Sequence, residues 1–186
     1  MTKTTPRHPA ALILALILAS LLCGCVVTGQ MAERRGTKAY LLKDYPTAAA
    51  NYQEAADDGD KDAQYHLAVM YAEGQGVGKD LAKAAGLLKR SADQGQTDAQ
   101  LMLGLFNIYG DGVPADPEAG ARLIARAAEA GSDVAMYYLG NLYAAGLGVE
   151  KDAAKGLYWM RQAREHGFPV SETIRTEADV EALYKD

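Results

Sequence analysis

The sequence is poor in residues that cross-link or catalyse, with two cysteines, three histidines and one tryptophan among 186 residues. Both cysteines, Cys23 and Cys25, lie near the N-terminus. The chain after residue 25 therefore has no thiol that could form a disulfide, ligate a metal or act as a nucleophile. Its folded part must be stabilised by packing alone.

Other catalytic signals are missing as well. After the N-terminal segment only His66 and His166 remain, and they do not form an H-x-x-x-H pair of metal ligands. No serine lies in the strand-turn-helix context of a hydrolase nucleophile. We therefore expect no catalytic residue, no metal site and no cofactor.

Positive charge is in the minority. The chain has 19 basic and 24 acidic residues, a net charge of −5. Removal of an N-terminal segment that carries Lys3 and Arg7 would leave 17 basic residues against 24 acidic ones, or −7. Because an acidic domain is repelled by phosphate backbones, nucleic acid is not an expected partner.

Long apolar runs are absent, and a short one stands near the N-terminus. It covers residues 10–22, 13 residues in all, and follows the basic residues Lys3 and Arg7. A helix that crosses a bilayer needs about 20 apolar residues. A basic flank before a shorter run is instead typical of a signal peptide, which we predict for residues 1–24.

The four residues LCGC at 22–25 resemble the lipobox of bacterial lipoproteins. That resemblance implies that Cys25 is lipidated, becomes the first residue of the mature chain and anchors it to a membrane, with residues 25–30 as a linker. Val26 follows where aspartate would favour retention at the inner membrane, so the resemblance implies the periplasmic side of the outer membrane. The alternative is an ordinary signal peptide whose cysteines are incidental.

A glycine-rich stretch, GQGVGKD at 74–80, is the kind of sequence that binds phosphate before a helix. It recurs as GDGVPAD at 110–116 and as GLGVEKD at 146–152, each time 36 residues further on. Lys79, the candidate phosphate ligand, becomes Ala115 in the second copy. The stretch is therefore predicted to be a structural turn within a repeat and not a nucleotide site.

Each repeat reads as helix, turn and helix. The first glycine of the turn suits the left-handed position that ends a helix, and its aspartate suits the N-cap of the next helix. Thr176 is a further cap candidate, before a last short helix. The predicted organisation is a solenoid over residues 31–168, made of a degenerate repeat at 31–59 and repeats at 60–95, 96–131 and 132–167, with a C-terminal capping helix at 169–186.

The spacing of alanine, leucine, aromatic and turn residues in these copies resembles the Sel-one-like repeat, an α/α relative of the tetratricopeptide repeat. The resemblance implies an all-α superhelical solenoid and a scaffold that mediates protein–protein interaction. Two residues depart from the pattern. Asn107 stands where the other copies have Tyr71 and Tyr143, and Arg164 stands where they have alanine.

The first helix of each repeat carries apolar residues on the face opposite its core-facing arc. Ala72, Ile108 and Ala144 lie on this face together with a column of larger residues. We call the larger residues the inner strip: Tyr65, Val69, Leu101, Leu105, Tyr137 and Asn141. In tetratricopeptide arrays the corresponding face is concave and binds peptides, so the resemblance implies a partner-binding groove here. The alternative is that the superhelix or the terminal helix buries the strip.

The expected function is a non-enzymatic, lipid-anchored scaffold that faces the periplasm and binds an envelope protein or peptide. One alternative is a structural subunit of an envelope export or secretion complex. Another is an accessory protein associated with peptidoglycan. A third follows from cysteine-rich relatives linked to β-lactams, but those carry a cysteine pair in each repeat, which this chain lacks.

Overall fold

The computed structural model describes residues 29–184, which form helices and no strands. The all-α repeat fold predicted from the sequence is confirmed. A helical segment at 29–41 is followed by α2 (Tyr45–Asp57), α3 (Lys61–Glu73), α4 (Leu81–Asp93), α5 (Thr97–Tyr109), α6 (Pro117–Glu129), α7 (Asp133–Ala145), α8 (Ala153–Glu165) and α9 (Glu177–Ala182). The predicted signal peptide and Cys25 lie outside the described residues. Residues 29 and 30, expected in the linker, are already helical.

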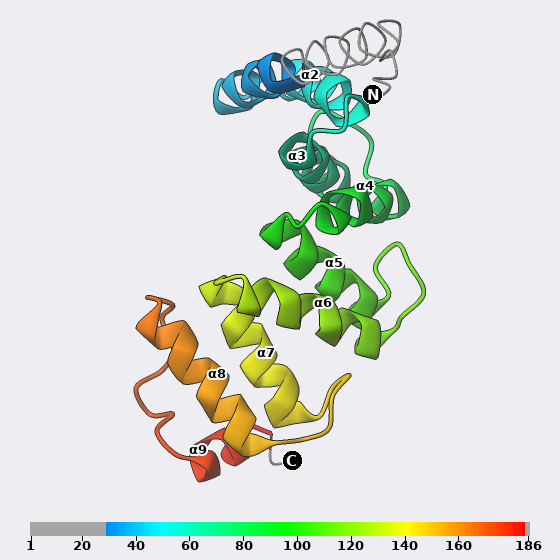
Figure 1. Ribbon diagram of the computed structural model, residues 1–186. Helices are drawn as coiled ribbons and strands as arrows, with labels where there is room; N and C mark the ends of the chain where they lie inside the picture. Colours follow the sequence, from blue (N-terminus) through cyan, green and yellow to red (C-terminus); the bar gives the residue numbers. More distant parts are fainter. Residues whose placement is uncertain (1–28, 185–186) are drawn as a thin grey trace, which may run out of the picture.

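The helices stack in chain order into an elongated, curved array, with the segment at 29–41 at one end and α9 at the other (Figure 1). Each helix packs on its neighbours in sequence, most extensively within the pairs α3–α4, α5–α6 and α7–α8. Within residues 29–184, no helix combines the length and the hydrophobicity that a bilayer crossing requires.

The turn inside each helix pair is fixed by the recurring glycine and aspartate, as predicted. Gly110 ends α5 in the left-handed region, with φ of 77°, and its equivalents end α3 and α7 in the same way. The Asp116 carboxylate caps α6 by accepting a hydrogen bond of 2.9 Å from the Ala119 amide. Gly112, with φ of 69°, lies so close to Leu81 that a Cβ atom would overlap the Leu81 carbonyl. These glycines are therefore required by the backbone.

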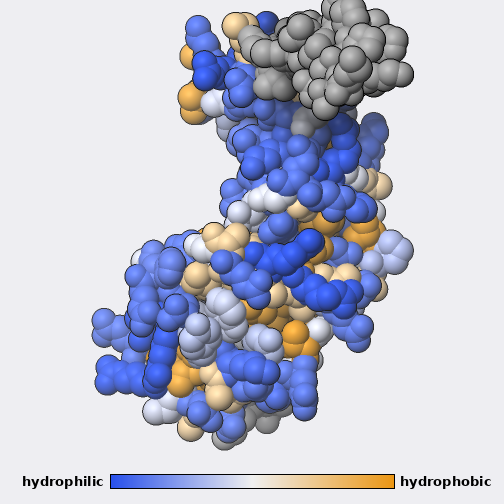
Figure 2. All heavy atoms as spheres, in the orientation of Figure 1, coloured by the Kyte–Doolittle hydropathy of each residue, from blue (hydrophilic) through white to orange (hydrophobic). Residues whose placement is uncertain are grey.

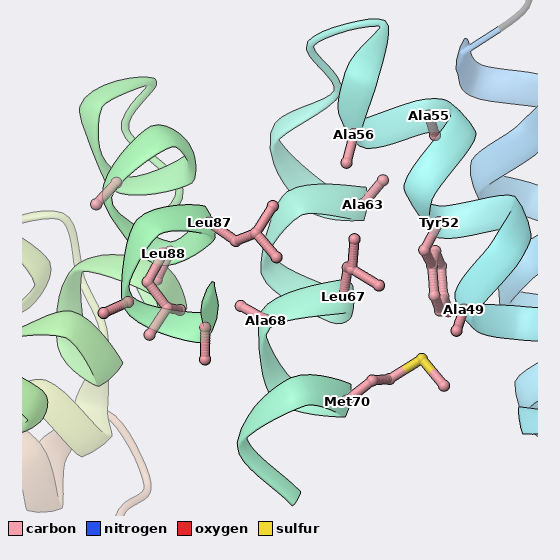
Figure 3. Close-up of a cluster of buried hydrophobic side chains, with 14 of the residues drawn as sticks. Ala49, Tyr52, Ala55, Ala56, Ala63, Leu67, Ala68, Met70, Leu87 and Leu88 are labelled. Atoms are coloured by element: carbon pink, nitrogen blue, oxygen red, sulfur yellow. The ribbon is translucent and has the colours of Figure 1, made fainter. Parts of the chain in front are cut away.

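The hydrophobic core is built from small residues that let the helices approach closely. Figure 3 shows α3 between its neighbours, with Leu67 and Met70 directed toward α2 and Ala68 directed toward α4. At the crossing of α5 and α6, a Cβ atom on Gly120 would lie 2.6 Å from the Gly104 carbonyl oxygen. The two clusters of buried side chains lie within residues 32–180, so the array carries its own core.

The chain after α8 covers the end of the array. Thr176 caps α9 in a reciprocal capping box with Asp179, and Val180 is fully buried against the last helix pair. The capping helix is shorter than predicted, because Leu183 and Tyr184 lie beyond it and are 49% and 38% exposed. Residues 169–176 are not helical.

Candidate interaction surface

The structure places all six residues of the inner strip on the first helices of their repeats, and each is partly buried. It does not give them one common environment. Tyr65 and Val69 line a pocket near the N-terminal end of the array. Leu101 and Leu105 pack against the second core cluster, and Tyr137 does so as well. The strip is thus divided between different local surroundings.

The pocket has a volume of about 260 Å³ and is rich in tyrosine. We call it the tyrosine pocket, lined by Thr37, Tyr40, Leu41, Tyr52, Tyr65, His66 and Val69. The His66 ring stacks on Tyr52 with 5.1 Å between ring centroids and lies 5.5 Å from the Tyr65 ring. His66 is therefore held by aromatic neighbours. A single residue in α3 thus joins the degenerate first repeat to the inner strip.

The hydroxyl groups of the pocket differ in their partners. Tyr52 shares a hydrogen bond of 3.0 Å with Thr37, and Tyr40 donates one of 3.0 Å to Gln75. The Tyr65 hydroxyl has no hydrogen-bond partner among residues 29–184. Burial raises the pKa of Tyr65, and the carboxylates of Asp98 and Glu73 raise it further, so this phenol stays protonated at neutral pH. It is a half-buried donor available to a ligand.

At the other end of the array, the chain itself covers the strip. The Phe168 ring stacks on Tyr137 with ring centroids 4.8 Å apart. The Tyr184 hydroxyl donates a hydrogen bond of 2.7 Å to Asn141. Burial raises the pKa of Tyr184, and the neighbouring phenols of Tyr137 and Tyr109 add to the shift. For the last repeat, the C-terminal segment thus occupies the surface that the sequence left open to a partner.

The exposed face of the first helices is rotated slightly from its predicted position. Ile108 and Ala144, expected beside the strip, are 7% and 1% exposed and belong to the core. Tyr109 is instead 68% exposed. The next residues along these helices, His66, Met102 and Tyr138, are partly buried like the strip itself. Which of these side chains are exposed depends on the rotation of each helix about its own axis. A helix that is apolar on nearly all sides does not determine this rotation from its sequence.

No group of three or more potential metal ligands occurs among residues 29–184. The regularly spaced aspartates serve as helix caps, since Asp44, Asp80, Asp116 and Asp152 each accept a backbone amide of the following helix. Among residues 29–184, this surface offers aromatic side chains, apolar area and the Tyr65 phenol without a hydrogen-bond partner. Such chemistry suits the recognition of another polypeptide.

A stack of helix pairs that presents partly buried aromatic residues along one face defines the class of α/α solenoid, tetratricopeptide-like proteins. The model of the Sel1 repeat matches residues 29–60, 61–96, 97–132 and 133–168. The chain belongs to the Sel1 repeat family. Proteins built from Sel1 repeats generally act as scaffolds for protein interaction.

Two solved structures from bacteria are similar over two thirds of the chain. A protective antigen present in uropathogenic Escherichia coli strains, which displays an SLR fold, is 35% identical with a TM-score of 0.65, over 67% of this chain and 27% of its own. A Sel1 repeat protein from Oxalobacter formigenes is 32% identical with a TM-score of 0.61, over 66% of this chain and 50% of its own. This chain thus spans half or less of each of these proteins. A comparison with curated proteins finds no match.

Proposed function

We propose that this chain is a lipid-anchored scaffold on the periplasmic side of the outer membrane, where it binds a peptide segment of an envelope protein. The role as an interaction scaffold is the general one of Sel1 repeat proteins. The anchor is supported by the lipobox-like sequence that ends at Cys25, and the outer membrane by Val26 after it. The mature lipid carries several acyl chains by the same resemblance, and several chains give stable attachment where one does not.

The tyrosine pocket is the observation that carries the binding proposal. Tyr65 presents an apolar ring and a hydroxyl without a partner among the described residues, and Val69 adds apolar surface one turn further along α3. Tyrosine is common among residues that dominate interface energies, because its ring excludes water while its hydroxyl still bonds. Tyr137 and Asn141 are held by Phe168 and Tyr184. The partner therefore contacts Tyr65, Val69, Leu101 and Leu105 first.

A photo-reactive residue placed at position 65 tests the binding surface directly. We expect it to form a discrete adduct with one envelope protein in intact cells. The matched control is the same residue at Tyr158, which is 55% exposed on α8 and belongs to no part of the strip. Adducts that form equally from positions 65 and 158 would contradict a partner site at the pocket. The substitution Tyr65→Ala should remove the partner from the purified scaffold without changing its helical content.

The lipid anchor needs a separate test, because the binding surface could serve a soluble protein equally well. The intact mass should show a chain that begins at Cys25 and carries acyl groups. Cys25→Ala should remain unprocessed at the inner membrane. A mature chain that begins elsewhere without acyl groups would remove the anchor and leave the scaffold role standing.

Two further roles predict different biochemistry for the same surface. A subunit of an export or secretion complex should co-purify with its neighbours at fixed stoichiometry. A peptidoglycan-associated protein should sediment with isolated sacculi when no other protein is present. The proposal of a non-enzymatic scaffold would fall if the purified chain turned over a chromogenic β-lactam.

A further inference from the structure

A second groove lies on the side of the array that carries the second helices. It has a volume of about 930 Å³ and runs between α4 and α6, with the Leu103 side of α5 at its base. Leu103 and Leu123 give it an apolar floor, and both are less than 10% exposed. We call it the α4–α6 groove. It shares no lining residue with the tyrosine pocket.

This groove exists because the middle repeat lacks a pair of residues that both neighbouring repeats have. In the repeat before it, the Lys83 ammonium lies over the Tyr71 ring, 5.3 Å from its centroid. In the repeat after it, Lys155 lies over Tyr143 at the same distance. Residues 107 and 119, 36 positions from each pair, are asparagine and alanine. A large aromatic side chain and the long chain that covers it are therefore both missing at one place.

The equivalent cleft one repeat further on shows the effect. It has a volume of about 520 Å³, and Tyr143 lines it where Asn107 lines the α4–α6 groove. Its wall also carries Arg122, whose equivalent on α4 is Gly86. The three smaller residues Gly86, Asn107 and Ala119 thus coincide with an apolar groove of nearly twice the volume. Figure 2 shows hydrophobic surface around α5 and α6, bordered by strongly hydrophilic side chains.

The charges along the groove are unequal between its two walls. On α4, Lys89 is neutralised by Asp93 through an ion pair of 2.8 Å. On α6, the guanidinium groups of Arg122 and Arg126 have no hydrogen bond and no ion pair with any residue from 29 to 184. They are four residues apart and therefore share one face of the helix. Glu129, which lies one turn beyond Arg126, is also unpaired among these residues and limits the positive stretch at that end.

We propose that the α4–α6 groove binds an acidic amphipathic peptide segment of a partner protein, at a site separate from the inner strip. Apolar side chains of the peptide would cover Leu103 and Leu123, which explains why an apolar groove of this size persists beside water. Carboxylates on one edge would meet Arg122 and Arg126, whose planar guanidinium groups can bind a carboxylate through two parallel hydrogen bonds. The rest of the chain is net negative and repels an acidic peptide, so such a peptide is directed to the positive edge of this groove.

The test uses the chain from Val26 onward, which includes both core clusters. The probe is a synthetic amphipathic peptide of about three helical turns, with leucine on one face and glutamate on the other. Its matched control carries glutamine in place of glutamate. We expect the glutamate peptide to bind in fluorescence anisotropy and the glutamine peptide to bind about tenfold more weakly. Arg122→Ala with Arg126→Ala should lower the affinity for the glutamate peptide to that of the glutamine peptide.

A groove-filling variant separates this site from every other surface. Asn107→Tyr with Ala119→Lys rebuilds the pair that Tyr143 and Lys155 already form, so it should fold normally while it closes the groove. We expect it to lose binding of the glutamate peptide, and Tyr65→Ala to retain it. Unchanged binding to the filled groove, or equal binding of the two peptides, would overturn the proposal. So would a concentration-dependent dimer of the unmodified chain that the filled groove abolishes, because the occupant would then be a second copy.

Discussion

The Tyr184 hydroxyl donates a hydrogen bond of 2.7 Å to the Oδ1 atom of Asn141, which joins the segment after α9 to the inner strip on α7. Asn141 also donates from its amide nitrogen to the Tyr137 carbonyl on its own helix, at 2.9 Å. Both ends of the Asn141 side chain are therefore engaged. The stacking of Phe168 on Tyr137 completes the cover over the last repeat. Among residues 29–184, the chain therefore covers the strip at its last repeat, whereas Tyr65 and Val69 line a pocket.

The first prediction concerns the titration of this contact. Because the pKa of Tyr184 is raised in the folded protein, the folded state holds the phenolic proton more tightly than the unfolded state does. The contact should therefore contribute its full stability below the ordinary tyrosine pKa of about 10, and lose it as the pH rises through the raised value. Ultraviolet difference absorbance of Tyr184→Phe should show one late-titrating tyrosine fewer than the unmodified chain. If the missing tyrosine is instead one that titrates at the ordinary value, the contact would be contradicted.

The second prediction concerns Arg164, the residue that departs from the alanine of the other repeats. Its guanidinium donates to the carbonyl oxygens of Ser171 at 2.7 Å and Ile174 at 3.1 Å, so it fastens the non-helical segment to α8. Arg164→Ala should leave the Ile174 carbonyl unpaired, remove one of the two donors to the Ser171 carbonyl and cost about 1–3 kcal/mol locally. We expect faster trypsin cleavage after Arg175 in the variant.

Arg161 supplies the control for that experiment. It donates to a single carbonyl, that of Arg175, at 2.6 Å and in an exposed setting. Arg161→Ala should therefore accelerate cleavage less than Arg164→Ala. Equal cleavage rates in both variants would show that Arg164 has no special part in holding the segment.

The sequence was sufficient to predict the repeat, the turn glycines and the helix caps. These features depend on local chemistry that recurs every 36 residues, so each copy supports the interpretation of the others. The rotation of each helix about its own axis was less well determined. Ile108 is apolar on a helix that is apolar nearly all round, and only packing against Gly120 shows that it faces inward.

The contacts that close the last repeat could not be predicted, since they depend on where an irregular segment crosses the array. Phe168 stands just after the last repeat, and nothing in its neighbours indicates that it returns to Tyr137. The role of Arg164 likewise could not be predicted, because the carbonyl groups that it binds belong to the same irregular segment. Asn107 was noted as a departure, yet its consequence depends on Ala119 and Gly86 acting at the same place.

The third prediction tests the close approach of paired helices. Gly120→Ala would place a methyl group 2.6 Å from the Gly104 carbonyl oxygen, so α5 and α6 must separate. We expect a loss of about 1–3 kcal/mol in the free energy of unfolding, measured by urea denaturation. The matched control is Gly86→Ala on α4, where a Cβ atom would meet nothing within 4 Å. That variant should gain up to about 1 kcal/mol from helix propensity. A similar loss from both substitutions would contradict the crossing geometry.

The fourth prediction concerns acid stability and rests on the caps of α4 and α8. The pKa values of Asp80 and Asp152 lie below the usual range, first because each carboxylate accepts a hydrogen bond from a backbone amide, that of Lys83 or Lys155. A lowered pKa in the folded state means that the stabilisation is complete above the ordinary aspartate value of about 4. It should be lost as the pH falls through the lowered values. Asp152→Asn retains an acceptor for the amide but cannot titrate, so its melting temperature should fall less between pH 6 and about pH 3 than that of the unmodified chain. If the melting temperatures of the two chains fall equally as the pH is lowered, titration of the Asp152 cap does not cause the loss of stability.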